Sequence, residues 1–253
     1  MLNDLSEVLD VELNRFVTEH PLHEIESHVL STLEQLQDGG PFPFGHNADL
    51  TLARCCYVMC RAIKPNYVLE TGVAYGVTSA FILKALEVNG RGVLHSIDLP
   101  PLEKNADQYI GVLIPPYLKE RWCLHRGVSK RLMPSLLRRL RCVDIFVHDS
   151  SHTYRNMHWE FETVWPYLRP GGVLIADDVN KNYAFNELRE RTLRSIIVKE
   201  EHKKNLFGIA IKSAEQRRQR SICETQPEAW RTFRKSCSLF LLGAKSYQYA
   251  IPN

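Results

Sequence analysis

The sequence predicts an α/β fold in which a mostly parallel sheet carries helices on both faces. Short apolar runs recur between residues 67 and 176, and segments of helical periodicity separate them. Strands that read as continuous apolar runs are buried on both faces, and parallel strands need crossover helices of this kind. Two further apolar runs, 195–199 and 206–211, flank a polar link and predict an antiparallel hairpin, so we expect a seven-stranded sheet in all.

The composition is that of an ordinary globular chain. Of its 253 residues, 44% are apolar and 24% are charged, which argues against a disordered chain. The 32 basic and 29 acidic residues give a net charge of +3, too balanced to indicate nucleic-acid binding by itself. No apolar run approaches the length of about 18 residues that a membrane span needs. The amino-terminal segment carries early acidic residues and does not resemble a secretory signal.

The seven cysteines favour a reduced, cytoplasmic protein. They are odd in number and form no Cys-x-x-Cys pair. Three of them, Cys55, Cys56 and Cys60, share one apolar stretch with helical periodicity. Because no histidine lies near them in the sequence, we expect these thiols to pack in the core rather than to bind a metal.

The elements are expected in the following order. A helix over about 4–37 ends at Gly39-Gly40, a loop follows over 41–45, and a second helix over about 49–63 ends before Pro65. Strands and helices then alternate, with Pro170-Gly171-Gly172 separating the last helix from the last parallel strand. The expected strands are 67–71, 93–97, 122–124, 143–147 and 173–176, and the expected helices are 78–86, 130–140 and one ending near Tyr167.

Two other segments allow more than one interpretation. The proline-marked stretch 99–116, which contains Ile110 and Ile114, is either a substrate lid or an ordinary packed loop. The arginine-rich run 217–220 is typical of a solvated helix face.

Small or acidic residues follow every predicted parallel strand. In open parallel sheets, ligands bind outside the carboxyl ends of the strands, so these residues are candidates for a common site. They are Glu70, Gly72 and Gly76 after the first strand, Asp98 after the second, Gly127 and Ser129 after the third, Asp149 and His152 after the fourth, and Asp177 and Asp178 after the fifth.

The glycine pattern after the first strand disfavours a nicotinamide cofactor. A dinucleotide fingerprint that started at Gly72 would need glycine at positions 74 and 77, where Ala74 and Val77 stand. Asp98 lies 98 − 72 = 26 residues beyond Gly72 and ends the next strand. A carboxylate at that place can accept hydrogen bonds from both hydroxyls of a ribose.

Together these segments resemble the successive motifs of class I S-adenosylmethionine (SAM) dependent methyltransferases. The resemblance is carried by YVLETGVAYGVTS, LHSIDLP, VDIFVHDSSHTY and LRPGGVLIADDV, and it covers about 65–180. It is closest to small-molecule O-methyltransferases of the macrolide-sugar and catechol types, which use a metal. It implies a Rossmann-like core over 65–213, a helical extension over 1–64 and a carboxy-terminal extension over 214–253.

The resemblance also implies roles for single residues. His152 would be the base, at the position where catechol-type enzymes have lysine. The metal, Mg²⁺, would be bound by Asp149, Asp177 and Asp178, although the catechol type has asparagine in place of Asp178. The residues that would bind SAM are Glu70, Gly72, Val73, Gly76, Thr78, Ser79, Asp98, Val128, Ser129 and Asp149.

Other interpretations remain open. Asp177 and Asp178 could cap the following helix without a metal, and His152 could be a structural hydrogen-bonding group, as we expect of His148. The implied activity is methyl transfer to a hydroxyl of a small molecule, such as a secondary metabolite. The alternatives are an RNA methyltransferase and a non-catalytic SAM-binding protein. The amino-terminal helices could also mediate a homo-oligomer.

Overall fold

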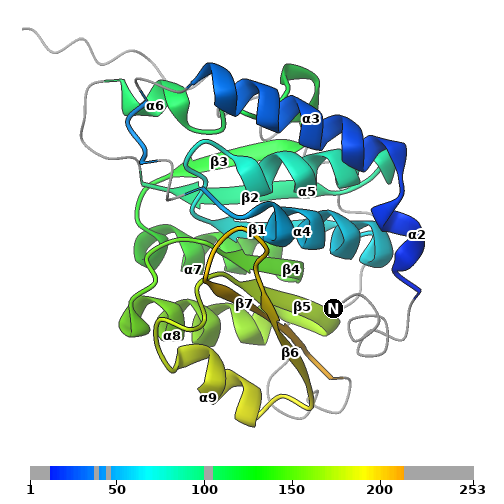
Figure 1. Ribbon diagram of the computed structural model, residues 1–253. Helices are drawn as coiled ribbons and strands as arrows, with labels where there is room; N and C mark the ends of the chain where they lie inside the picture. Colours follow the sequence, from blue (N-terminus) through cyan, green and yellow to red (C-terminus); the bar gives the residue numbers. More distant parts are fainter. Residues whose placement is uncertain (1–11, 37–39, 44–46, 100–104, 214–253) are drawn as a thin grey trace, which may run out of the picture.

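The seven predicted strands form one mixed sheet through the middle of the molecule (Figure 1). This computed structural model describes residues 12–36, 40–43, 47–99 and 105–213. The strand order is β3-β2-β1-β4-β5-β7-β6, with β1 to β5 parallel and β7 antiparallel to both β5 and β6. The strands are β1 (Tyr67–Thr71), β2 (Val93–Asp98), β3 (Trp122–Arg126), β4 (Val143–His148), β5 (Leu168–Ala176), β6 (Arg194–Lys199) and β7 (Leu206–Ile211).

Helices cover both faces of this sheet. In Figure 1, α4 and α5 lie on one face with α3 beside α5, and α7, α8 and α9 lie on the other. Neighbouring strand residues therefore enter different cores: Val68 packs with the first group and Leu69 with the second. The helices are α2 (Asn14–Val17), α3 (His20–Gln35), α4 (Leu50–Ile63), α5 (Val77–Val88), α6 (Ala106–Tyr109), α7 (Ser129–Leu140), α8 (Tyr154–Val164) and α9 (Ala184–Glu190), with 3₁₀ turns η2 (Pro116–Arg121) and η3 (Trp165–Tyr167).

The prediction of one continuous helix over 4–37 is wrong in the part that the structure describes. The chain leaves helical geometry between α2 and α3, where Glu19 is extended (φ −67°, ψ 132°). Pro21 occupies the first turn of α3, where its missing N–H has no partner to lose. The second predicted helix is confirmed as α4, which ends at Ile63 with Lys64 as its left-handed cap.

The prediction that Pro170-Gly171-Gly172 precedes the last parallel strand is also wrong. These residues lie inside β5, which runs from Leu168 to Ala176. The N–H of Gly171 donates to the carbonyl of Lys212 (2.7 Å), and the N–H of Lys212 donates to the carbonyl of Gly172 (2.9 Å). Gly171 has φ +76°, which glycine adopts without strain, and the register of β4 against β5 shifts nearby.

Two smaller points concern packing. Ile110 and Ile114 are buried in the core, and the described part of 99–116 includes the short helix α6. The thiols Cys55, Cys56 and Cys60 are free and buried, as expected.

Two further points concern the limits of the chain. No helix within the described ranges is long and apolar enough to cross a membrane. The arginine-rich run 217–220 lies outside the described residues.

Candidate active site

The loop between β1 and α5 has a backbone that only particular residues can adopt. Gly72 has φ +83°, and a Cβ there would lie 1.9 Å from the carbonyl oxygen of Asp149. Gly76 has φ +95° and stands directly before α5. Ala74 also has a positive φ, +48°, and its N–H donates to Oδ2 of Asp98 (3.3 Å). The loop therefore touches both the β4 loop and the end of β2 through its main chain.

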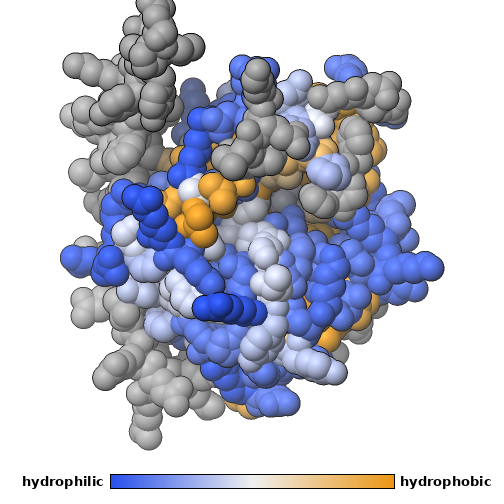
Figure 2. Space-filling view, turned by 90° about the vertical axis from the view of Figure 1, so that its left-hand side faces the viewer, coloured by the Kyte–Doolittle hydropathy of each residue, from blue (hydrophilic) through white to orange (hydrophobic). Residues whose placement is uncertain are grey.

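A cavity of about 550 Å³ opens at the carboxyl ends of the strands. Figure 2 shows this side of the molecule, where a hydrophobic patch adjoins a largely hydrophilic surface. Of the residues that line the cavity, Leu99 and Val128 are large apolar residues that remain substantially exposed. The predicted site residues that line it are Gly72, Val73, Asp98, Gly127, Val128, Ser129, Asp149, His152, Asp177 and Asp178.

Four predicted cofactor residues do not line the cavity. Glu70, Thr78 and Ser79 are buried beneath it, and Gly76 faces Gly111. Oε2 of Glu70 accepts hydrogen bonds from Ser79 (2.6 Å) and from the hydroxyl of Ser96 (2.7 Å). Burial raises the pKa of Glu70 to about 7. This carboxyl thus supports the glycine loop from below, through the first turn of α5.

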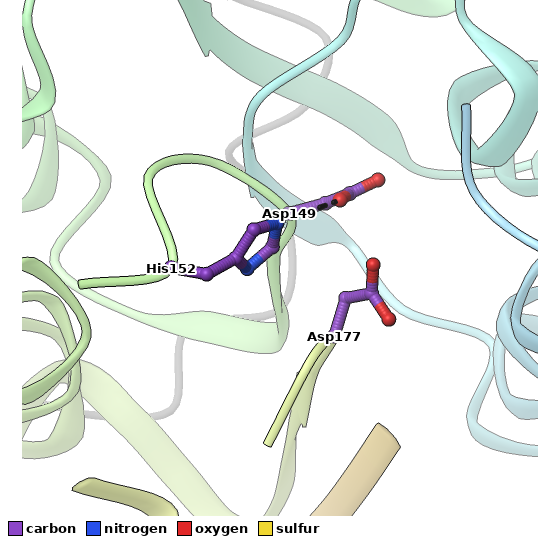
Figure 3. Close-up of side chains that lie close together, drawn as sticks. All are labelled: Asp149, His152 and Asp177. Carbon is purple, nitrogen blue, oxygen red and sulfur yellow. Dashed lines mark ion pairs between the residues drawn. The ribbon is translucent and has the colours of Figure 1, made fainter. Parts of the chain in front are cut away.

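Three of the predicted residues converge at the other end of the cavity. Asp149 and His152 lie on the loop after β4, and Asp177 follows β5 (Figure 3). One ligand atom of each residue lies within 4.8 Å of the others, a spacing that could hold a metal ion. Nδ1 of His152 is buried and has no hydrogen-bond partner among the described groups. The cluster therefore offers two carboxylates and an imidazole to a cation.

The electrostatics of this cluster are unfavourable without a positive charge. Burial, together with the nearby Asp177 carboxylate, raises the pKa of Asp149 well above its usual range. Burial and the Asp178 carboxylate likewise raise the pKa of Asp177. Burial, and then the neighbouring His148, lower the pKa of His152 to about 4. The imidazole is consequently neutral at pH 7, as both a metal ligand and a proton acceptor must be.

Asp178 is placed differently from the metal ligand that we expected. Its φ is +55°, and its Oδ2 lies 2.5 Å from Nζ of Lys181 and 3.3 Å from Nε2 of His152. Its Oδ1 is buried without a partner among the described groups. Asp178 therefore balances Lys181 and orients His152, while Asp149, His152 and Asp177 form the closer group.

A buried network supports the β4 loop, and His148 belongs to it, as expected of a structural histidine. Nδ1 of His148 lies 2.7 Å from Oε2 of Glu160, and both side chains are fully buried. The same carboxylate accepts from Thr71 (2.7 Å), and its other oxygen accepts from Ser150 (3.1 Å). Glu160, on α8, was not singled out from the sequence. It lies 12 residues after His148, and no sequence pattern links the two residues, which meet only because α8 packs against the β4 loop.

The tip of the β6–β7 hairpin brings further groups that the sequence did not reveal. Lys203 and Asn205 line the cavity. Glu200 is buried, neither of its carboxylate oxygens accepts a hydrogen bond from a described donor, and it lies beside Asp177. Burial and the Asp177 charge raise the pKa of Glu200 to about 8. Glu200 could have been predicted from the sequence, because it is an acidic residue that directly follows a strand, as Asp149 and Asp177 do.

Residues 69–179 match the sequence profile of a family described as "Methyltransferase domain". The chain also resembles solved structures. A putative O-methyltransferase from Klebsiella pneumoniae matches at 14% identity and TM-score 0.56, over 78% of this chain and 91% of that one. An O-methyltransferase from Bacillus cereus in complex with SAH matches at 16% identity and TM-score 0.55, over 78% and 92%.

A third structure, the O-methyltransferase TomG from Streptomyces achromogenes, involved in tomaymycin synthesis and in complex with SAM, matches at 16% identity and TM-score 0.54, over 78% and 91%. No curated protein matches the chain significantly. At these identities the structures show the fold, which is that of class I methyltransferases with added amino-terminal helices.

Proposed function

We propose that this chain, in which residues 69–179 form a methyltransferase domain, transfers a methyl group from SAM to a hydroxyl of a small molecule. One observation carries the proposal. A single cavity joins the glycine loop and Asp98 to the cluster of Asp149, His152 and Asp177. The cofactors named with the Bacillus and Streptomyces structures support SAM, and the Streptomyces protein's part in tomaymycin synthesis favours a secondary metabolite as acceptor.

The cofactor end of the cavity fits SAM. At Gly72 there is no side chain to keep a ligand from the main chain, and Asp98 presents a carboxylate for a ribose. Leu99 and Val128 are 61% and 48% exposed, and they offer apolar surface for a flat base. The acidic residues beyond the loop suit the positive charge of a sulfonium. SAM, when bound, would supply the methyl group.

The cluster at the other end fits a divalent cation. Carboxylate oxygens suit Mg²⁺ or Mn²⁺, and the crowded acids of Asp149 and Asp177 would lose their mutual repulsion beside such an ion. A divalent ion, when bound, would supply positive charge that lowers the pKa of the acceptor hydroxyl. We propose that Asp149 and Asp177 hold this cation.

The residues of the chain would do the remaining work. Asp98 and the glycine loop hold the donor, and the β4 loop places His152 beside the acceptor hydroxyl. The acceptor hydroxyl would give its proton to Nε2 of His152, so that its oxygen can take the methyl group that SAM would supply. Asp178, 3.3 Å from that nitrogen, would stabilise the protonated ring.

Calorimetric titration of S-adenosylhomocysteine (SAH) tests the donor site directly. We expect the native chain to bind SAH, and a chain that does not bind it would refute the proposal. Transfer of labelled methyl groups to a panel of phenols, hydroxylated sugars and RNA tests the acceptor class. We expect transfer to small hydroxylated molecules, lost in EDTA and restored by Mg²⁺ or Mn²⁺. Transfer to RNA alone, or full activity in EDTA, would refute the acceptor class or the metal respectively.

The role of His152 is tested by a matched pair of variants. His152→Ala should keep its divalent-ion affinity and lose activity by about 10²-fold or more, since it would lack the base. A loss of ion affinity of about tenfold or more would instead make His152 a metal ligand. His158→Ala is the control, because His158 is 43% exposed and lies on α8 outside the cavity.

A further inference from the structure

We propose that Tyr75 couples the donor-binding loop to Phe42, so that binding of the donor fixes the part of the cavity wall that Phe42 forms. This inference rests on the proposed function. Tyr75 is fully buried within the loop 72–76, and Phe42 comes from the segment between α3 and α4. Two distant parts of the chain therefore meet at one hydroxyl.

Tyr75 and Phe42 are joined by two hydrogen bonds and by a contact between their rings. The hydroxyl of Tyr75 donates to the carbonyl of Phe42 (2.9 Å) and accepts from the N–H of Phe42 (3.2 Å). Their rings meet edge to face with centroids 5.1 Å apart. A single phenol thus satisfies both main-chain groups of Phe42, and the described residues 40–43 around it have no regular secondary structure.

Gly40 shows that the chain is shaped around this hydroxyl. A Cβ at position 40 would lie 1.9 Å from Oη of Tyr75. No side chain larger than hydrogen can stand there while the hydroxyl keeps its place. The glycine is thus required by the close approach to Tyr75.

The same loop also holds a second segment, residues 109–113, in place. The carbonyl of Tyr75 accepts from the N–H of Leu113 (3.0 Å), and the carbonyl of Ala74 accepts from the N–H of Gly111 (3.0 Å). The ring of Tyr75 also meets that of Tyr109, with centroids 6.4 Å apart. A change in the loop must therefore be felt by both segments that pack against it.

Phe42 faces the cavity from this anchored segment. It is the only phenylalanine, tyrosine or tryptophan among the described residues that line the cavity. Many of the other lining residues are charged or polar, such as Asp177, Lys181, Lys203 and Asn205. We therefore expect Phe42 to favour acceptors that present an apolar face to the cavity.

Donor and acceptor binding are coupled as a consequence. Residues 72–74 of this loop line the cavity, and Tyr75, the next residue, donates its hydroxyl hydrogen bond to Phe42. A donor that restricts the loop must also restrict Phe42, because the two hydrogen bonds transmit the restriction. Phe42 would therefore be fully ordered for acceptor binding only after the donor is bound.

Hydrogen exchange at single amides tests this coupling, with SAH as the probe. In the native chain, SAH should slow exchange of the Phe42 amide by about tenfold or more. In Tyr75→Phe, SAH should still bind, and the additional protection of Phe42 should vanish. Tyr109→Phe is the matched control, because it removes a neighbouring phenol and leaves the contacts of Tyr75 intact. Its SAH-dependent protection of Phe42 should equal that of the native chain.

The alternative outcomes are distinct. Equal SAH-dependent protection in Tyr75→Phe and in the native chain would overturn the coupling while leaving the methyltransferase proposal untouched. Failure of the native chain to bind SAH would overturn both. If Tyr75→Phe does not fold, Gly40→Ala tests the same link, because its Cβ displaces the hydroxyl and should abolish the SAH-dependent protection of Phe42. A Gly40→Ala chain that retains that protection would again overturn the coupling.

Discussion

Replacing Gly72 by alanine should damage the site more than any comparable glycine substitution in the described chain. The backbone at Gly72 has φ +83°, which costs an L residue about 1–2 kcal/mol. The new Cβ would also lie 1.9 Å from the carbonyl oxygen of Asp149, which is main chain and cannot rotate away. Such overpacking adds about 1–3 kcal/mol, so the total loss of stability is about 2–5 kcal/mol.

Gly90→Ala isolates the backbone contribution. Gly90 has φ +66° and nothing within 4 Å of the position of its Cβ, so this variant should lose only about 1–2 kcal/mol. At roughly 2–4 °C per kcal/mol for a chain of this size, we expect Tm to fall by about 2–8 °C for Gly90→Ala and by about 4–20 °C for Gly72→Ala. Thermal unfolding followed by circular dichroism measures both shifts.

The two variants should also differ in binding. The Cβ at position 72 pushes on the loop that carries Asp149, so Gly72→Ala should weaken both SAH and divalent-ion binding in calorimetric titrations. Gly90→Ala should bind both as the native chain does. Equal losses of Tm for the two variants, or undisturbed ion binding by Gly72→Ala, would refute the reasoning from this contact.

Three other predictions follow from single side chains. Burial raises the pKa of Glu70 from 4.5 to about 7, so its contribution should make the native chain lose about 3 kcal/mol of stability as the pH rises from 4.5 to 7, and Glu70→Gln should abolish that part of the slope in pH-dependent chemical denaturation. Lys212 is buried and its ammonium donates to three main-chain carbonyls, so Lys212→Met should cost about 2 kcal/mol in urea unfolding, whereas the exposed Lys199→Met should cost almost nothing. Asp98→Asn should weaken SAH binding by about tenfold or more in calorimetry, and the exposed Asp107→Asn should leave it unchanged. The first prediction would be contradicted if Glu70→Gln and the native chain lost stability equally as the pH rises. Equal urea midpoints for Lys212→Met and Lys199→Met would contradict the second, and native SAH affinity in Asp98→Asn the third.

Much of the sheet could be predicted because its strands are buried on both faces. A short apolar run such as VDIFV is typical of a strand that is buried on both faces, and it forms β4, whose residues are all buried. The extension of β5 through Pro170 and Gly171 could not be predicted in this way. It depends on a hydrogen bond from Gly171 to Lys212, 41 residues later, and local composition contains no trace of that pairing.

The candidate site divides along the same line. Asp149, His152 and Asp177 converge as expected, because Asp149 and Asp177 directly follow neighbouring parallel strands and His152 lies on the same loop as Asp149. Phe42 and Lys203 reach the cavity from the segment before α4 and from the hairpin tip, whose approach to the sheet is set by tertiary packing. Asp178 also lines the cavity, and it has a positive φ and forms an ion pair with Lys181 that the sequence did not indicate.

The hairpin tip also determines when the site can form. Asp49, which caps α4, accepts from the N–H of His202 (3.1 Å), and the hydroxyl of Thr51 accepts from the N–H of Glu201 (3.1 Å). These partners are about 150 residues apart, so loop closure delays their meeting during folding. Because Lys203 and Asn205 line the cavity, we expect a chain that is stopped before residue 200 during synthesis to lack this part of the cavity wall.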